Sequence, residues 1–236
     1  MRNYYRESLT ESQSDAVDGL EVFLGSEESC FLLTGYAGTG KTYILSQLSD
    51  YLNDSGKTYY FLTPTGRAAR VIRKRTQKAA YTIHSRIYEV KNNNVTSEDT
   101  DYDDLKVIFN LRNNLDPTDT IYIIDESSMI SDKYSDNERL QFGSGKLLSD
   151  LIAYANVTNT QRKIIFVGDE AQLTPVNSNF SPALSSNYLQ EQYQLSCCGK
   201  QLTDVYRQDG ESGILSQATK VRNQMRDNSF AEVPII

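Results

Sequence analysis

Short runs of hydrophobic residues alternate along this chain with segments in which hydrophobic residues recur every three or four positions. The continuous runs fall at residues 30–34, 57–63, 120–124 and 163–168. Runs of this length predict strands that are buried on both faces, as in a parallel sheet. The segments between them have helical periodicity. The pattern therefore predicts an α/β fold, with a mostly parallel sheet flanked by helices.

Helices are expected in six segments, which have an apolar face, a capping residue at the start, or both. They cover residues 10–24, 42–55, 67–78, 143–155, 182–190 and 212–225. Residues 193–206 predict one or two further strands. Residues 89–119 are largely polar and acidic, so they predict an inserted hairpin or a flexible excursion and not an element of the core.

A glycine-rich turn, Gly-Tyr-Ala-Gly-Thr-Gly-Lys-Thr, follows the first strand and fits the phosphate-binding P-loop pattern. Glycine allows positive φ and leaves no Cβ in the way, so consecutive backbone N–H groups can point at phosphate oxygens. Lys41 would contact the β- and γ-phosphates, and the Thr42 hydroxyl would bind Mg²⁺. The alternative is a glycine-rich turn without a ligand. The residues of this turn expected to bind ATP are Gly35, Ala37, Gly38, Thr39, Gly40, Lys41 and Thr42.

Two carboxylates, Asp125 and Glu126, follow the third strand. Ligands of parallel α/β sheets bind at the carboxyl ends of the strands, so both side chains reach the edge that carries the P-loop. Asp125 can hold Mg²⁺, and Glu126 can orient or deprotonate the water that attacks the γ-phosphate, which favours a hydrolase over a kinase. Gln172, after the fourth strand, can hydrogen-bond the γ-phosphate. The alternatives are a chance Asp-Glu pair and an ordinary exit from the fourth strand.

The 236-residue chain has a net charge of −7 and is long enough for one large or two small domains. That charge argues against a protein whose whole surface attracts nucleic acid, although a local basic strip can still do so. The third expected helix carries such a strip, which is either a solvated helix face or a contact for a phosphate backbone. Its basic residues are Arg67, Arg70, Arg73, Lys74, Arg75 and Lys78.

Three cysteines without a C-x-x-C pair predict a protein that has no disulfide and binds no zinc. No apolar run approaches the roughly 20 residues that span a bilayer, and the first residues lack the apolar segment of a signal peptide. We therefore expect a cytoplasmic protein that does not associate with a membrane.

In their order along the chain, these motifs resemble those of the first motor domain of a superfamily 1 DNA helicase, in the RecD-like branch. The resemblance spans nearly the whole chain and implies a RecA-like P-loop NTPase domain with a small insertion after motif Ib. The motifs are Leu9–Gln13 (Q motif), Gly35–Thr42 (Walker A), Thr63–Ala69 (Ia), Thr82–Ser85 (Ib), Asp125–Met129 (II), Gly168–Val176 (III) and Leu202–Gln208 (IV).

The resemblance also implies a role for individual residues. Gln13 would read adenine, and Gln172 and Arg207 would contact the γ-phosphate, with Arg207 supplying charge to the transition state. The implied catalytic residues are Lys41, Glu126, Gln172 and Arg207. Single-stranded DNA would be contacted by Thr63, Pro64, Thr65, Arg67 and His84. The alternative for His84, the only histidine, is a purely structural role.

By this resemblance the chain is part of an ATP-dependent DNA helicase that moves 5′ to 3′ and uses ATP and Mg²⁺. Relatives carry a second RecA-like domain with motifs V and VI, and this sequence ends before such motifs. We therefore expect residues 1–236 to be the first motor domain of a longer chain, which binds ATP·Mg²⁺ and single-stranded DNA but hydrolyses ATP slowly or not at all. The alternative is a stand-alone P-loop ATPase switch or binding module that acts on a protein partner.

Overall fold

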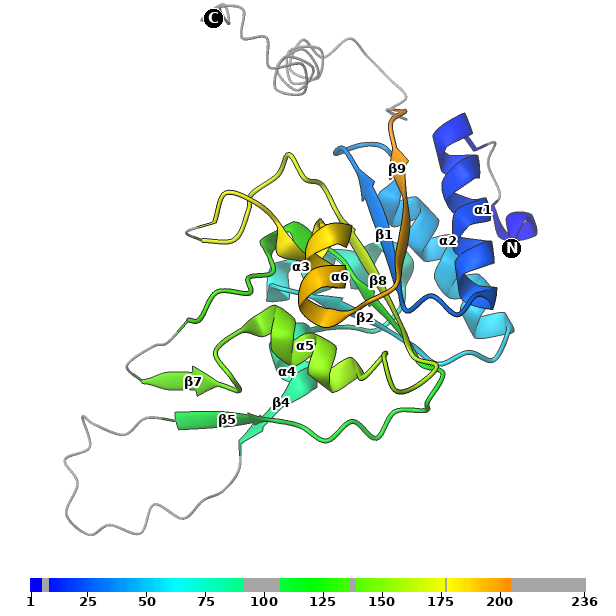
Figure 1. Ribbon diagram of the computed structural model, residues 1–236. Coiled ribbons are helices and arrows are strands. Elements are labelled where there is room, and N and C mark those ends of the chain that lie inside the picture. Colours follow the sequence, from blue (N-terminus) through cyan, green and yellow to red (C-terminus); the bar gives the residue numbers. More distant parts are fainter. Residues whose placement is uncertain (6–8, 91–106, 136–138, 177, 205–236) are drawn as a thin grey trace, which may run out of the picture. The chain divides into compact units, whose positions relative to one another are not determined.

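The computed structural model describes residues 1–5, 9–90, 107–135, 139–176 and 178–204 (Figure 1). The centre of this part of the chain is a six-stranded sheet in the order β3-β2-β6-β8-β1-β9, in which every pair of neighbours is parallel. The predicted fold class is therefore confirmed. The six strands are β1 (Cys30–Gly35), β2 (Tyr59–Thr63), β3 (Ala80–Thr82), β6 (Ile121–Ile124), β8 (Lys163–Gly168) and β9 (Cys197–Leu202).

Helices cover both faces of this sheet, and successive strand residues pack alternately against one face or the other. Phe61 packs in the core under α1, α2 and α3, whereas its neighbour Leu62 packs in the core under α4, α5 and α6. This alternation is the normal geometry of a strand, and burial on both faces explains the continuous apolar runs. The helices are α1 (Glu11–Gly25), α2 (Lys41–Asp54), α3 (Gly66–Thr76), α4 (Ile83–Ile87), α5 (Leu147–Ala155) and α6 (Ser186–Tyr193).

The start of α1 is fixed by a capping box between Thr10 and Gln13. The Thr10 hydroxyl accepts a hydrogen bond from the backbone N–H of Gln13 at 3.4 Å, and Gln13 Oε1 accepts one from the N–H of Thr10 at 3.1 Å. These two bonds satisfy N–H groups that have no partner within the helix. The predicted helix start at Thr10 is confirmed.

A second, three-stranded sheet is formed by β4 (Tyr88–Val90), β5 (Val107–Leu111) and β7 (Leu140–Phe142). β4 and β5 pair antiparallel, as a hairpin does, while residues 91–106 between them lie outside the described part. The structure adds a strand that the sequence pattern did not reveal, because β7 pairs parallel with β5 from beyond the predicted insertion. Stacking of Phe109 on Phe142, with ring centroids 4.6 Å apart, holds the two strands together.

The last part of the predicted excursion, residues 112–119, is anchored to the core, contrary to expectation. Asp116 Oδ2 accepts a hydrogen bond from the phenol of Tyr122 at 2.7 Å, and its other oxygen pairs with Arg86. Asn114 donates to the same phenol and to the carbonyl of Tyr154, both at 2.7 Å. Polar side chains in this segment bind polar groups of the core, which a reading of polarity alone does not reveal.

Three further expectations about secondary structure change. The helix expected from Gly143 begins at Leu147, because Gly143 and Gly145 have φ of 46° and 81° and form a turn. The segment 182–190 divides into a 3₁₀ turn, η4 (Pro182–Leu184), and the start of α6, and residues 193–206 contain one strand, β9, within the described part. The helix expected at 212–225 lies outside the described residues.

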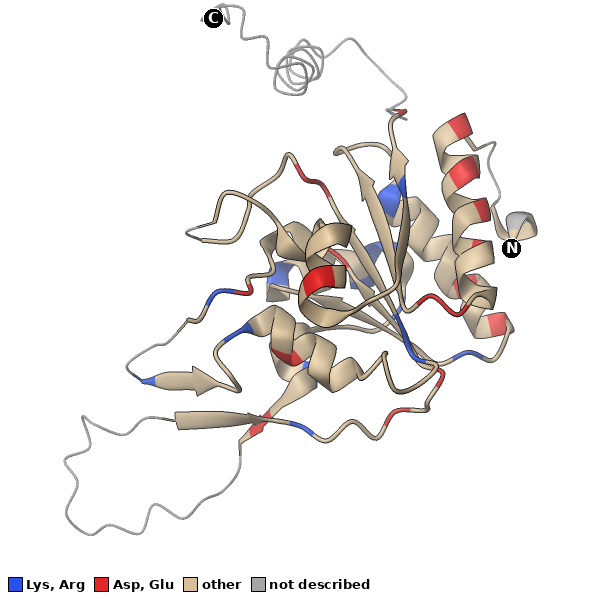
Figure 2. Cartoon of the chain, in the orientation of Figure 1, with Lys and Arg blue, Asp and Glu red and all other residues tan. Residues whose placement is uncertain are grey.

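Charge is unevenly distributed over these elements. Figure 2 shows acidic residues at intervals along α1, and they are Glu11, Asp15, Asp18 and Glu21. In contrast, α3 contains five basic residues, and three of them lie in its last turn. Within the described part of the chain, no helix combines the length and the hydrophobicity needed to cross a membrane.

Candidate active site

The P-loop connects β1 to α2 at the carboxyl edge of the sheet. Gly38 and Gly40 have φ of 87° and 92°, in the left-handed region that favours glycine. Gly40 is the N-cap of α2 and provides no side-chain hydrogen bond to the helix. The first N–H groups of a helix have no partner within it, and the helix dipole adds positive charge at this end. This helix terminus therefore suits an anion such as phosphate.

Contacts within the loop hold it in a compact turn. Lys41 Nζ donates to the carbonyl oxygens of Gly35 and Tyr36, the latter at 3.0 Å. Thr39, which is fully buried, donates from its hydroxyl to the Tyr36 carbonyl at 2.8 Å. A Cβ on Gly35 would lie 2.8 Å from Leu202 Cβ and 2.9 Å from Thr39 Oγ1, so only glycine fits there.

Asp125 and Glu126 follow β6, in the order that the sequence predicts. The Asp125 N–H donates to the Leu62 carbonyl at 2.9 Å, which continues the pairing with β2. Burial and, next, the negative charge of Glu126 raise the pKa of Asp125 to about 6, while a hydrogen bond from the Glu126 backbone and the charges of Lys41 and Arg75 partly oppose the shift. Glu126 has φ of 56°, a strained conformation for a residue that has a Cβ.

A cavity of about 550 Å³ joins residues that the sequence assigned to two different ligands. Asp125, Glu126 and Gln172, from the predicted ATP side, line it together with Thr65 and Arg67, from the predicted DNA side. The remaining wall is mainly apolar and consists of Ala68, Val71, Met129, Ala171 and Leu173, with Ser128. Residues from motifs Ia, II and III are therefore adjacent in the fold.

Arg75 is a neighbour of the site that the sequence did not identify. Its guanidinium donates to the hydroxyl of Thr42 at 3.5 Å, a long hydrogen bond, and its charge lowers the pKa of Asp125. Its position on the basic helix suggested only a solvated helix face or a contact with a phosphate backbone. The helix sequence could not show that this side chain points toward α2, because that depends on how α2 and α3 pack.

Residues predicted to touch DNA lie in unlike environments. Arg67 is exposed and Pro64 half-buried, whereas Thr65 caps α3 by accepting from the Ala68 N–H at 3.2 Å. Thr63 is fully buried, and its hydroxyl donates to the Thr65 carbonyl at 2.9 Å. The Thr63 side chain therefore stabilises this turn from within, and its contact with DNA stays a prediction.

His84 is half-buried, and aromatic rings surround it. Its ring meets Phe142 edge-on, with centroids 5.0 Å apart, and lies 5.6 Å from the ring of Tyr88. Burial lowers the pKa of His84 below its usual value of 6.5. Its DNA contact stays a prediction, and Arg207 lies outside the described residues.

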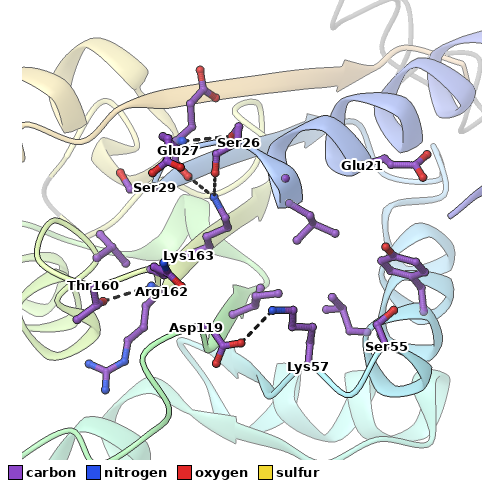
Figure 3. Close-up of a pocket in the computed structure, with 18 residues that line it drawn as sticks. Glu21, Ser26, Glu27, Ser29, Ser55, Lys57, Asp119, Thr160, Arg162 and Lys163 are labelled. Atoms are coloured by element: carbon purple, nitrogen blue, oxygen red, sulfur yellow. Dashed lines mark hydrogen bonds and ion pairs between the residues drawn. The ribbon is translucent and has the colours of Figure 1, made fainter.

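A second cavity, of about 380 Å³, lies at the opposite end of the strands (Figure 3). Its basic residues are bound to protein partners: Lys57 pairs with Asp119 at 2.9 Å, and Lys163 Nζ donates to the carbonyls of Ser26 and Glu28 at 2.8 and 2.6 Å. Arg162 donates to the Pro117 carbonyl at 3.1 Å. Ligands of parallel sheets bind at the carboxyl ends, so the first cavity is the better candidate.

The residues near the P-loop fit the predicted Mg²⁺. Asp125 and Thr42 offer a carboxylate and a hydroxyl, the oxygen ligands that Mg²⁺ prefers, and Mg²⁺ usually takes its other ligands from water and from substrate phosphates. Across the described ranges, no three His, Cys, Asp or Glu side chains are placed to hold a metal ion together.

Comparison with known sequences gives one family and two relatives. The family described as the AAA domain matches residues 8–233. The ATP-dependent DNA helicase dda of Enterobacteria phage T4 is 29% identical over 219 residues, which cover 92% of this chain and 43% of the helicase. An uncharacterized protein of Methanocaldococcus jannaschii is 32% identical over 190 residues, which cover 76% of this chain and 14% of that protein. The chain thus spans less than half the length of these relatives.

Solved structures share the fold. The Pif1 helicase from Bacteroides gives a TM-score of 0.54 at 21% identity in one structure, which covers 96% of this chain and 48% of that one. Unliganded Pif1 from Bacteroides sp gives 0.51 at 20% identity, with 95% and 47% covered.

Proposed function

Because the chain belongs to the AAA domain family, we propose that it is the first, ATP-binding motor domain of a superfamily 1 DNA helicase. The observation that carries this proposal is the arrangement at one edge of the sheet. The neighbouring strands β6, β8 and β1 end there in Asp125-Glu126, in the loop of Gln172, and in the P-loop. The likeness to the phage helicase over 92% of the chain supports it.

In this proposal the triphosphate lies on the P-loop. Lys41, now bound to two carbonyls of its own loop, turns to the β- and γ-phosphates, and Thr42 and Asp125 hold Mg²⁺. Bound Mg²⁺ would neutralise charge on the phosphates. Glu126 orients the attacking water, and Gln172 senses the γ-phosphate from the same cavity. Arg207 contributes positive charge to the transition state.

We further propose that a second RecA-like domain completes this site in the full-length protein, as the greater length of the relatives suggests. Closing two domains around ATP would convert hydrolysis into movement along DNA. In the proposed helicase this movement runs 5′ to 3′, as in the RecD-like branch. The isolated domain would bind ATP·Mg²⁺ but hydrolyse it weakly.

Single-stranded DNA would lie over the cavity that Thr65 and Arg67 share with Glu126, which links the DNA contact to the catalytic carboxylate. The exposed residues Arg70 and Lys74 extend the positive surface along α3. Contacts of this kind bind the phosphate backbone without reading sequence.

The experiment measures single-stranded DNA binding by fluorescence anisotropy at several salt concentrations. Changing Arg67, Arg70 and Lys74 together to Glu should abolish binding, whereas Lys57→Glu, an exposed change at the other end of the strands, should leave it nearly unchanged. In milder single variants the salt slope should fall by about 0.7 for each lost phosphate contact. DNA binding that survives the triple change would instead favour an ATPase switch that acts on a protein partner.

A further inference from the structure

Gln13 lies buried between the first turn of α1 and the P-loop, and only 3% of the residue's surface is exposed. Both ends of its amide have a partner within the protein. Oε1 accepts from the Thr10 N–H at 3.1 Å, and Nε2 donates to the carbonyl of Thr39 at 3.0 Å. The amide group has a second N–H and a second lone pair, so these two bonds do not by themselves exclude contact with adenine, whereas the burial of Gln13 restricts it.

The bond to Thr39 determines how the next N–H group of the loop is turned. The Thr39 carbonyl and the Gly40 N–H belong to one planar trans peptide unit, so they point in opposite directions. Because Gln13 holds the carbonyl on its own side, the Gly40 N–H faces away from α1. Backbone N–H groups are the donors with which a P-loop holds phosphate, so their direction determines the affinity for the anion.

Gly40 is matched to this contact. A Cβ at Gly40 would lie 2.5 Å from Gln13 Nε2, closer than atoms can approach, and its φ of 92° already favours glycine. The Gln13 amide therefore occupies the space that a side chain at position 40 would need.

The first turn of α1 is itself held firmly on its other side. Ser12 donates to Asp204 Oδ2 from its hydroxyl at 2.7 Å and from its backbone N–H at 3.1 Å. The N–H of Thr203 donates to the Ser12 hydroxyl at 3.3 Å. Gln13 therefore projects from a turn that is tied to the end of β9, and it can fix the loop rather than follow it.

Resting on the nucleotide site proposed above, we infer that Gln13 is a positioning residue, which sets the phosphate-binding conformation of the P-loop through the Thr39 carbonyl. In this role Gln13 raises affinity for any ligand that carries the triphosphate group, whatever its base. Adenine recognition is the competing role, and it affects only nucleotides that carry adenine.

Calorimetric titrations with ATP, GTP and inorganic tripolyphosphate, each with Mg²⁺, distinguish the two roles. Gln13→Leu keeps the volume and adds no charge but removes both hydrogen bonds. It should weaken the binding of all three ligands by the same factor, of the order of threefold to tenfold for the loss of a neutral hydrogen bond. Ser14→Ala, one residue along the same helix, should change none of them. A loss confined to ATP would overturn the positioning role.

A measurement on the unaltered protein covers the case in which Gln13→Leu fails to fold. The NMR signal of the Gln13 side-chain NH₂ should shift when tripolyphosphate is added and stay unchanged when adenosine is added. The reverse result would overturn the positioning role. If the unaltered protein binds neither ATP nor tripolyphosphate, both the proposed nucleotide site and this inference are overturned. If the unaltered protein binds them, but Gln13→Leu weakens the affinity for ATP more than the affinities for GTP and tripolyphosphate, only the inference is overturned.

Discussion

The guanidinium of Arg75, on α3, lies within 3.5 Å of the hydroxyl of Thr42, the P-loop residue proposed to hold Mg²⁺. The side chain of Arg75 thus lies near the proposed phosphate site. Arg75→Gln should weaken binding of ATP in the absence of Mg²⁺ about two- to fivefold, because an exposed charge pair contributes up to ~1 kcal/mol. Binding of a fluorescent ATP analogue in EDTA tests this.

The control for that change is Arg73→Gln, which removes an exposed charge from the same helix. It should alter ATP binding less than Arg75→Gln, and the difference should shrink at high salt as screening increases. Equal effects of the two variants would show that Arg75 contributes only to the general charge of the helix.

The left-handed backbone of Glu126, with φ of 56°, indicates that the carboxylate proposed to orient the attacking water lowers the stability of the fold. Glycine adopts this conformation without strain, so Glu126→Gly should leave the free energy of unfolding unchanged or raise it by up to ~1 kcal/mol. Urea denaturation measures the change, with Glu126→Gln as the variant that keeps the strain. A clear loss of stability in Glu126→Gly alone would contradict this account of the backbone.

His84 should titrate below 6.5, because its ring is buried against Tyr88 and Phe142. The unfolded chain then binds a proton more readily than the folded one. Stability that is complete above pH 6.5 is therefore lost as the pH falls through the lowered pKa. Because His84 is the only histidine, its ring signal can be followed by NMR. His84→Phe should remove this part of the pH dependence of the free energy of unfolding between pH 7.5 and 5. A titration at or above 6.5 would show that the ring is not buried.

Asp116 should contribute far more to stability than the nearby Asp119. Asp116 is largely buried and binds Arg86 and Tyr122, whereas Asp119 forms an exposed pair with Lys57 at 2.9 Å. Asp116→Asn should lower the free energy of unfolding by about 3 kcal/mol, because it leaves buried partners unsatisfied. Asp119→Asn should lower it by less than ~1 kcal/mol. Similar losses in the two variants would contradict the role of Asp116 as an anchor.

The sequence predicted the fold class and the motor-domain resemblance, and both are confirmed. Long elements such as β1 and α2 were predicted correctly, because their hydrophobic period and the glycines of the P-loop determine local structure without tertiary contacts. The short strands β3 and β7 were missed, since three residues are too few to show alternation. Gly143 and Gly145 lie in the turn before α5, where the apolar period alone suggested a helix.

The site was predicted less completely, for a physical reason. The motif order identified the residues, but which of them share a cavity depends on how α3 packs on β2 and β3 and so faces the loop after β6. The approach of Arg75 to Thr42 and the burial of Thr63 are consequences of that packing. The branch also stays open: the relatives carry the names Pif1 and dda, so RecD-like remains a prediction.

The central claim is that Lys41 and Glu126 act on one bound ATP at different steps. The most direct measurement is the affinity for ATP·Mg²⁺ of the unaltered chain, Lys41→Ala and Glu126→Gln, determined side by side by calorimetry. We predict that Lys41→Ala abolishes binding, whereas Glu126→Gln binds as the unaltered chain does, because Glu126 contacts the attacking water and not the phosphates. Equal loss of binding in both variants, or binding that survives Lys41→Ala unchanged, would contradict the proposed site.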